Sequence, residues 1–237
     1  MVNTELVVLD MAGTTVADDG LVIRAFTTAI AAAGVSEKDS RFPGMLDYVV
    51  ETMGRSKIVV FRALLDGNEE LAQRANTAFQ DAYGELVADG HCEPIPGAEQ
   101  TIQELRAQGM KVALTTGFAA STQNAILDAL GWHGLADAVL APSEGVSGVR
   151  GVSGVRGRPF PDLVLAAALR LEVTDVRRIA VAGDTPSDIR TGLTSGASLV
   201  AGVLTGSAKK PELEAAGATH VLQSVRDLPA LLSLKEF

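Results

Sequence analysis

Cysteine is almost absent from this sequence of 237 residues, which contains only Cys92. A single cysteine excludes an intrachain disulfide and a zinc site built from several cysteines. Long apolar runs are also missing, since none approaches the roughly 18 residues that a membrane-spanning helix needs. No basic segment followed by an apolar run stands at the N-terminus, as it would in a secretion signal. We therefore expect a cytoplasmic protein without a membrane partner.

Basic residues are outnumbered: 20 Lys and Arg stand against 29 Asp and Glu, which gives a net charge of −9. A chain this acidic lacks the positive surface that attracts nucleic acid, so we expect no nucleic-acid partner. An anionic substrate would need cations placed locally in its site, or a bound metal. The sequence does not fix the oligomeric state and leaves a homodimer open.

The stretch from Glu5 to Thr15, ELVVLDMAGTT, is the first informative one. Its apolar run from Leu6 to Leu9 is typical of a strand buried on both faces of a parallel sheet. The run stops at Asp10, which a turn of small residues follows. Open α/β sheets bind ligands at the carboxyl ends of their strands, so Asp10 is a candidate site residue. The alternative is that Asp10 only caps the turn.

A helical segment separates this strand from the rest of the chain. Residues 21–33, 45–65 and 69–88 are predicted to be helical, with no strand-like run among them. Pro94 and Pro96 then mark a linker. We predict that residues 16–91 form an all-helical cap domain inserted after the first strand.

Strands and helices alternate after the linker. The predicted strands are 111–115, 137–140, 178–182 and 198–203, and the predicted helices are 98–108, 121–130, 162–171, 186–195 and 211–216. This alternation implies βαβ units, hence an α/β fold with a doubly wound parallel sheet in a three-layer α/β/α core. We predict that residues 1–15 and 92–237 together form this catalytic core.

One hexapeptide, VSGVRG, occurs twice in succession, at 146–151 and 152–157. A period of six that is repeated only once does not indicate a solenoid. We interpret it as a tandem duplication that lengthens a glycine-rich loop, next to Arg158 and so at the border of the predicted site.

Further polar side chains follow other predicted strands, where a parallel topology brings them to the same sheet edge as Asp10. They are two hydroxyls, a guanidinium and two carboxylates: Thr115, Thr116, Arg158, Asp184 and Asp188. Clustered carboxylates destabilise a fold unless a cation binds them, and an oxygen-rich site beside a phosphate suits Mg²⁺. Arg158 would offset phosphate charge, and N–H groups near Thr116 and Gly117 would hold phosphate oxygens. The pattern predicts an Mg²⁺ cofactor and a small phosphorylated substrate.

These motifs, in this order, resemble those of the haloacid dehalogenase superfamily over essentially the whole chain: D-x-x-G-T, a strand-end Thr, a basic residue and G-D-x-x-x-D. The resemblance implies that Asp10 is a nucleophile that forms an aspartyl-phosphate. It implies that Thr116 holds the phosphoryl group and that Arg158 stabilises its charge. The metal ligands that it implies are Asp10, the backbone carbonyl of Ala12, Asp184, and Asp188 directly or through water.

Ala12 departs from the phosphatases of this superfamily. Those enzymes usually carry a second Asp two residues after the nucleophile, which protonates the departing alkoxide and later activates water. Here that position has only a methyl group. We therefore expect a reaction whose leaving group needs no such acid.

The phosphonoacetaldehyde hydrolases of the superfamily meet this requirement, and the sequence resembles them through D-x-A-G-T-T, G-R-P-x-P and G-D-T-x-S-D. Their cap lysine lies in an M-G-x-x-K segment, which is Met53 to Lys57 here. In that family the lysine forms a Schiff base with the substrate aldehyde, and the iminium accepts the electrons of the breaking C–P bond. The resemblance implies this role for Lys57 and a phosphonate substrate. The residues that it places around the substrate are Gly13, Thr14, Met53, Gly54, Thr115, Gly117 and Phe118.

Three family residues have no counterpart here. The histidine three positions after the lysine is Val60, the tyrosine after Thr-Gly is Phe118, and Gly20 or Leu21 stands where the cap has a cysteine. Two alternatives stay open: a phosphatase of a small phosphate monoester, similar to phosphoglycolate phosphatases, and a catalytically silent binding protein. In the first, some other cap or solvent group would replace the missing acid. The alternative to a Schiff base at Lys57 is that this lysine only pairs with the substrate phosphoryl or carboxylate group as a cation.

Two smaller segments receive structural interpretations. We interpret the acidic pair Asp18 and Asp19 as part of the hinge turn by which the chain leaves the core for the cap. Gly202, Thr205 and Gly206 are predicted to shape the edge of the phosphate pocket.

Overall fold

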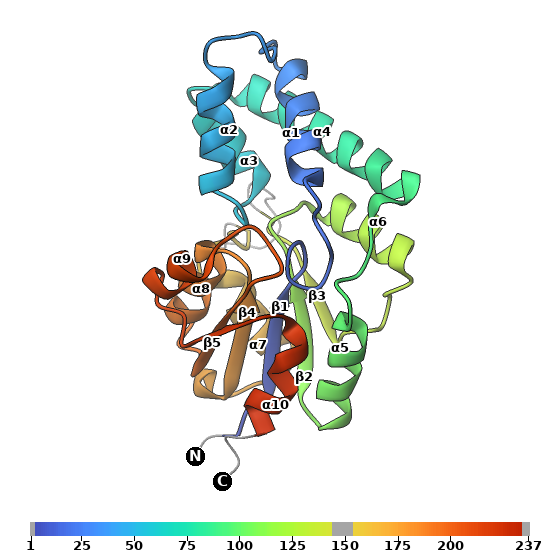
Figure 1. The fold of residues 1–237 in the computed structure, drawn as a ribbon, viewed down its shortest axis with the longest axis vertical. Helices are drawn as coiled ribbons and strands as arrows, with labels where there is room; N and C mark the ends of the chain where they lie inside the picture. The colour runs from blue at the N-terminus through green and yellow to red at the C-terminus, as the bar shows by residue number, and fades with distance from the viewer. Residues whose placement is uncertain (1–2, 144–153, 234–237) are drawn as a thin grey trace.

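The computed structural model describes residues 3–143 and 154–233. Six parallel strands form one sheet in the order β3-β2-β1-β4-β5-β6 (Figure 1). Their bounds are β1 Leu6–Asp10, β2 Lys111–Thr115, β3 Ala138–Leu140, β4 Ile179–Gly183, β5 Leu199–Val203 and β6 His220–Leu222. The predicted α/β fold with a parallel sheet is confirmed. The strand that comes first in the chain lies in the middle of that sheet.

Strand β1 is central because its apolar side chains are buried on both faces. Successive residues of a strand point to opposite faces. Leu6 and Val8 pack in one apolar cluster with α7 (Asp162–Arg170), whereas Val7 and Leu9 pack in another with α5 (Ala98–Ala107). One cluster fills the interface between the sheet and the helical layer on each of its two faces. The strand ends with Asp10 paired in register with Thr115 of β2, so these two side chains start from adjacent points.

A group of helices lies beyond the carboxyl ends of the strands (Figure 1). It consists of α1 Leu21–Ala32, α2 Phe42–Glu51, α3 Lys57–Leu64 and α4 Glu69–Leu86, followed by one π-helical turn, Val87–His91. The rings of Phe26, Phe61 and Phe79 meet at centroid distances of 5.9 and 6.2 Å between successive pairs and form much of the apolar centre of this group. Residues 16–91, all of them described, contain helices and no strand. Their division from the core as a separate domain stays a prediction.

The prediction of one helical stretch over 45–65 is wrong, because two helices occupy it. Helix α2 ends at Glu51, and Gly54 adopts a left-handed conformation with φ of +80° that an α-helix cannot contain. Ser56 is extended, and α3 then begins at Lys57. Lys57 therefore stands at a helix N-terminus rather than in the middle of a helix.

The C-terminal part also differs from the prediction, which ended with a helix at 211–216. That helix is α9, Lys210–Ala215, but β6 and a further helix, α10 Leu228–Ser233, follow it. Strand β6 has three residues and α10 has six, so neither gives an apolar pattern long enough to recognise. Helix α10 packs near α5 on the face of the sheet that Val7 and Leu9 share.

The remaining helices of the core are α6 Ala120–Leu130 and α8 Pro186–Thr194, and both follow strands at the site edge. The first copy of the duplicated hexapeptide and the first two residues of the second lie outside the described residues, so its interpretation stays a prediction. None of the helices in the described ranges combines the length and apolar character that a membrane crossing requires.

Candidate active site

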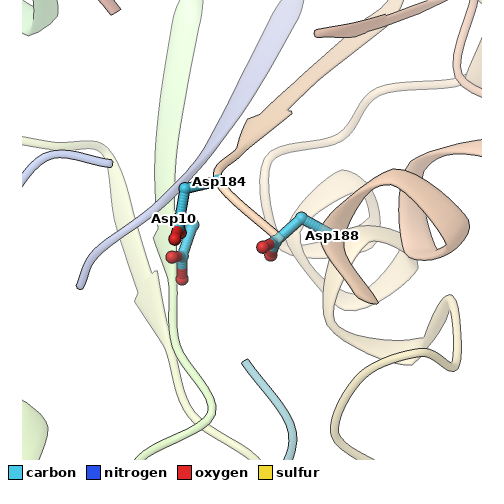
Figure 2. A group of neighbouring side chains, drawn as sticks. All are labelled: Asp10, Asp184 and Asp188. Carbon is cyan, nitrogen blue, oxygen red and sulfur yellow. The ribbon is translucent and has the colours of Figure 1, made fainter. Parts of the chain in front are cut away.

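Three buried carboxylates meet at the carboxyl ends of the two central strands (Figure 2). Asp10 ends β1, Asp184 directly follows β4, and Asp188 lies in the first turn of α8. One carboxylate oxygen from each residue lies within 4.8 Å of the corresponding oxygens of the other two. The prediction that these acids meet at one sheet edge is confirmed.

Arg158 lies between two of these carboxylates. Its Nη2 is 2.7 Å from Asp10 Oδ1, and its Nε is 2.7 Å from Asp188 Oδ1. Its Nη2 also donates a hydrogen bond of 2.8 Å to the hydroxyl of Thr115. The guanidinium is almost completely buried. Thr115 therefore positions Arg158 rather than facing the open part of the site.

Asp184 and Asp188 are also held by groups of their own elements and of nearby loops. The backbone N–H of Ser207 donates to Asp184 Oδ2 at 2.8 Å, and the Thr14 hydroxyl donates to Oδ1 at 3.3 Å. Thr185 and Asp188 form a capping box, in which Thr185 N donates to Asp188 Oδ2 at 3.0 Å. Since Arg158 contacts the other oxygen of Asp188, both of its oxygens are engaged by protein groups.

The cluster carries more negative charge than its protein partners neutralise. Burial raises the pKa of Asp10 well above its usual range, against the opposing effect of Arg158 and with a further rise from Asp188 and Asp184. Burial likewise raises the pKa of Asp184 to about 6, with a contribution from the Asp188 charge. A divalent cation that prefers oxygen ligands would compensate this charge, so the donor set fits such an ion.

A cavity of about 290 Å³ opens in front of Asp10. The predicted site residues that line it are Asp10, Ala12, Gly13, Met53, Gly54, Lys57, Thr116, Gly117, Phe118, Arg158 and Asp184. Thr205 and Gly206 also line it, as predicted, whereas Gly202 lies in β5 and outside its lining. Thr14, Thr115 and Asp188 do not reach the cavity. They contact Asp184 or Arg158 from behind, so sequence position alone did not separate lining residues from supporting ones.

Lys57 lies in the wall of this cavity and is buried, with 8% of its surface exposed. Its Nζ is 5.4 Å from the centroid of the Phe118 ring and 5.7 Å from that of Phe79. Burial lowers the pKa of Lys57 to about 8, while the charges of Asp18 and Asp10 act in the opposite direction. An amine with a lowered pKa and the carboxylate of Asp10 thus share one cavity.

Two of the positions that depart from the phosphonoacetaldehyde hydrolases, Phe118 and Val60, have apolar surroundings in the structure. Phe118 lines the cavity, and its ring lies 4.7 Å from that of Tyr83 between centroids. The Phe118 backbone N–H donates to the Thr116 hydroxyl at 3.1 Å, which fixes the strand-end loop. Val60 is buried in the apolar core of the helical group and is absent from the cavity lining.

A second acidic element of the cavity was not predicted from the sequence. Asp18 and Asp19 form the expected turn, with Asp19 at a φ of 40° and Gly20 at 78°, but both acids also line the cavity. Asp18 Oδ1 accepts a hydrogen bond from Val22 N at 3.2 Å in the first turn of α1. Other residues of the cavity lining were not predicted either: Ala17, Val22, Ile95, Thr185 and Ser207. The acidic pair directly before a helix was the signal available for Asp18.

Known proteins share both the sequence and the fold of this chain. The family model described as haloacid dehalogenase-like hydrolase matches residues 4–196. A phosphonoacetaldehyde hydrolase of Bacteroides fragilis is 27% identical, over 99% of this chain and 97% of that protein. A phosphonoacetaldehyde hydrolase of Syntrophobacter fumaroxidans is 34% identical, over 80% of this chain and 69% of that protein.

Solved structures agree with the sequence matches. A hydrolase from Pseudomonas syringae superimposes with a TM-score of 0.79 at 24% identity, covering 98% of this chain and 99% of that one. A phosphonoacetaldehyde hydrolase-like protein from Oleispira antarctica gives a TM-score of 0.78 at 25% identity, covering 97% of this chain and 91% of that one. With the family model matched over most of its length, this chain belongs to the haloacid dehalogenase-like hydrolases and is an enzyme.

Proposed function

We propose that this enzyme cleaves the C–P bond of phosphonoacetaldehyde or a related small phosphonate aldehyde, with Asp10 as nucleophile and Lys57 as the amine that forms a Schiff base. The observation that carries the proposal is that Lys57 and Asp10 line the same cavity, with Ala12 where an acid would otherwise stand. The names of the relatives in Bacteroides fragilis and Syntrophobacter fumaroxidans support the same chemistry.

Mg²⁺ is the cofactor that we propose for the carboxylate cluster. Asp10, Asp184 and the backbone carbonyl of Ala12 would hold it, with Asp188 as a direct or water-mediated ligand. The support is the chemistry of the donors, which are all oxygens, and the excess of three buried carboxylates over one guanidinium. When bound, Mg²⁺ supplies charge neutralisation for the phosphoryl oxygens.

Arg158 and Thr116 would bind the transferred group. Arg158 is already in contact with Asp10, so a phosphoryl group that arrives at this carboxylate meets the guanidinium. Thr116 and Gly117 line the cavity beside Asp10 and would hold phosphoryl oxygens through the Thr116 hydroxyl and the backbone. Asp10 would attack phosphorus, and water would then release phosphate from the aspartyl-phosphate.

Lys57 would activate the carbon side of the substrate. The neutral amine condenses with the aldehyde and, with the uptake of one proton, gives an iminium and water. The iminium then accepts the electron pair of the C–P bond as that bond breaks. The product is an enamine, so no alkoxide forms that would need a proton. A methyl group at Ala12, in place of an acid, is consistent with this. Burial of Lys57 supports the role because it makes the neutral amine accessible near neutral pH.

The helical group would act as a cap domain over residues 16–91, on a core of 1–15 and 92–237. Support comes from close contacts between the segment that precedes Lys57 and the core. Arg55 pairs with Arg158 in an isolated parallel bridge, and Arg158 Nη1 donates to the Gly54 carbonyl at 3.4 Å. These contacts bring the start of α3 to the phosphoryl end of the site.

A phosphatase of small phosphate monoesters is the second candidate. It is favoured by Phe118 and Val60, which lack the polar groups that phosphonoacetaldehyde hydrolases carry at these positions. Lys57 would then bind the substrate only as a cation. A catalytically silent protein gains no support from a cavity that Asp10, Lys57 and Arg158 line together.

A substrate panel decides between the two candidates. Phosphate release is measured for phosphonoacetaldehyde and for a set of phosphate monoesters including phosphoglycolate, with and without Mg²⁺. We expect Mg²⁺-dependent release from phosphonoacetaldehyde, and none from the Asp10→Asn variant. Turnover of the monoesters alone would support the phosphatase, and full activity of Asp10→Asn would overturn the assignment of the nucleophile.

A further inference from the structure

Asp18 and Asp19 are neighbours in sequence but differ in their surroundings. Both line the cavity that contains Lys57. Asp18 is half-buried, whereas Asp19 is exposed. The bond from Val22 N to Asp18 Oδ1 fixes this carboxylate at the N-terminus of α1. Among the described residues no hydrogen bond or ion pair within 4.0 Å engages Asp18 Oδ2, so this oxygen is available to a group in the cavity.

Lys57 needs a proton acceptor that its immediate neighbours cannot provide. The rings of Phe79 and Phe118 flank its amine, and Met53 is a further apolar neighbour in the cavity wall. An ammonium cannot attack an aldehyde until it loses a proton. The acceptor must therefore come from another side of the cavity.

Four carboxylates line the cavity: Asp10, Asp18, Asp19 and Asp184. In the proposed function Asp10 attacks phosphorus and Asp184 binds the metal, so neither is free to exchange protons with Lys57. Asp19 is exposed to solvent and has a left-handed backbone conformation in the turn before α1. Asp18 is the remaining carboxylate, and it is anchored.

The electrostatics of the cavity agree with this assignment. After burial, the charge of Asp18 has the largest effect on the pKa of Lys57, ahead of Asp10, Arg158 and Asp184. Burial raises the pKa of Asp18, and the Lys57 charge is among the influences that lower it. The pKa of the acid and that of the amine are thus shifted toward one another, which makes a proton transfer between them less costly.

We propose that Asp18 is the proton partner of Lys57 in Schiff-base formation, an inference that rests on the proposed function. Asp18 takes a proton from the Lys57 ammonium, and the neutral amine adds to the aldehyde carbon to give a carbinolamine. Asp18 then returns the proton to the carbinolamine hydroxyl, which leaves as water while the C=N bond of the iminium forms. The balance is one ammonium and one aldehyde in, one iminium and one water out.

The distance between the two groups defines how the proton moves. No ion pair within 4.0 Å joins Lys57 to Asp18 in the described residues, so in this proposal water carries the first proton from the ammonium to Asp18. The carbinolamine hydroxyl then accepts the returning proton. The same carboxylate replaces the polar groups that the chain lacks at Val60 and Phe118.

The variants Asp18→Asn and Asp19→Asn form a matched pair for the test. Asparagine at 18 still accepts the Val22 N–H bond, so the start of α1 is preserved while the charge and the proton are lost. Two quantities are measured on the full-length protein. The first is the rate of borohydride trapping with phosphonoacetaldehyde at Lys57. The second is the pH midpoint of Lys57 acetylation by acetic anhydride, followed by peptide mass spectrometry.

For Asp18→Asn we expect trapping to slow by about 10²-fold, the usual lower range for loss of a positioned acid–base group. We also expect the acetylation midpoint of Lys57 to move to lower pH by about one pH unit, because an opposite charge near the ammonium is gone. A merely structural role would not move that midpoint in this direction. Asp19→Asn is expected to leave both quantities as in the wild-type protein.

The two proposals fail in different ways. If wild-type protein forms an adduct and Asp18→Asn forms it at the same rate, the role of Asp18 is overturned while the Schiff base stands. An unchanged acetylation midpoint in Asp18→Asn also overturns it. If wild-type protein forms no adduct at Lys57, the proposed function itself is overturned.

Discussion

The amine of Lys57 lies 5.4 Å from the centroid of the Phe118 ring. Two effects act on the lysine in this position. The ring face attracts an ammonium by about 0.5–2 kcal/mol, whereas burial favours the neutral amine. Burial lowers the pKa of Lys57 to about 8 against the charges of Asp18 and Asp10. A hydrocarbon wall, rather than a hydroxyl at position 118, thus adjusts the reactivity of this amine.

Replacement of Lys57 by arginine separates the chemical role of the residue from its charge. Arginine keeps the positive charge but cannot form an imine with an aldehyde. We expect Lys57→Arg to lose both the borohydride-trapped adduct and the turnover of phosphonoacetaldehyde. Lys210→Arg, an exposed substitution on α9, serves as the control and should retain both. Normal turnover in Lys57→Arg would leave only an electrostatic role for the lysine.

Lys57 should also reduce the stability of the fold. Its pKa of about 8 lies below the value of 10.5 in an unfolded chain, so the unfolded state binds more protons between these pH values. From this group alone, stability is lowest below pH 8 and rises as the pH increases toward 10.5. By linkage the buried ammonium costs about 3 kcal/mol at pH 7.

Lys57→Met tests that cost, because methionine is similar in shape and uncharged. We expect its free energy of unfolding at pH 7 to exceed that of wild type by up to about 3 kcal/mol. The difference should shrink as the pH rises from 8 to 10.5. Urea unfolding at pH 7 and pH 10 measures both effects, with Lys210→Met as the exposed control. A variant with the pH dependence of wild type would contradict the lowered pKa.

Metal binding is testable without any substrate. If the carboxylate cluster binds Mg²⁺, an excess of about 100 times the Kd should stabilise the protein by about 2.7 kcal/mol. For a chain of this length that corresponds to a rise in Tm of about 5–10 °C. Asp184→Asn should abolish the rise, while Asp128→Asn, at an exposed position on α6, should keep it. An equal rise in both variants would place the ion elsewhere.

Much of the core could be predicted because its signals are local. Strand β1 is buried on both faces, which gives a continuous apolar run, and Asp10 ends that run. The alternation of strands and helices fixes the parallel topology. Position at a strand end, however, does not say which way a side chain points. Thr115 was therefore predicted to contact the substrate, although its hydroxyl accepts a bond from Arg158.

The helical group was less predictable because apolar residues continue on both sides of the interruption between α2 and α3. Between α2 and α3, the signals for the change of direction are Gly54 and the N-cap residue Ser56, and either residue is also tolerated inside helices. Asp18 was assigned to a hinge turn for a similar reason. Its place in the cavity depends on how α1 meets α3, and that is a tertiary relationship which neither segment encodes alone.

Gly117 lies directly against the backbone of the segment that precedes Lys57. A Cβ at position 117 would lie 2.5 Å from the Gly54 carbonyl oxygen and 2.7 Å from that of Arg55. Both are backbone atoms and cannot rotate away, so Gly117→Ala must displace the segment and, with it, the start of α3.

A displacement of about 1 Å between reacting groups can cost about 10²-fold in rate. We expect kcat/KM of Gly117→Ala to fall by about that factor while the circular dichroism spectrum is unchanged. Gly84→Ala is the control, because a Cβ there meets no atom within 4 Å and alanine suits the last turn of α4, where Gly84 lies. If Gly117→Ala is as active as Gly84→Ala, the position of Lys57 does not depend on this contact.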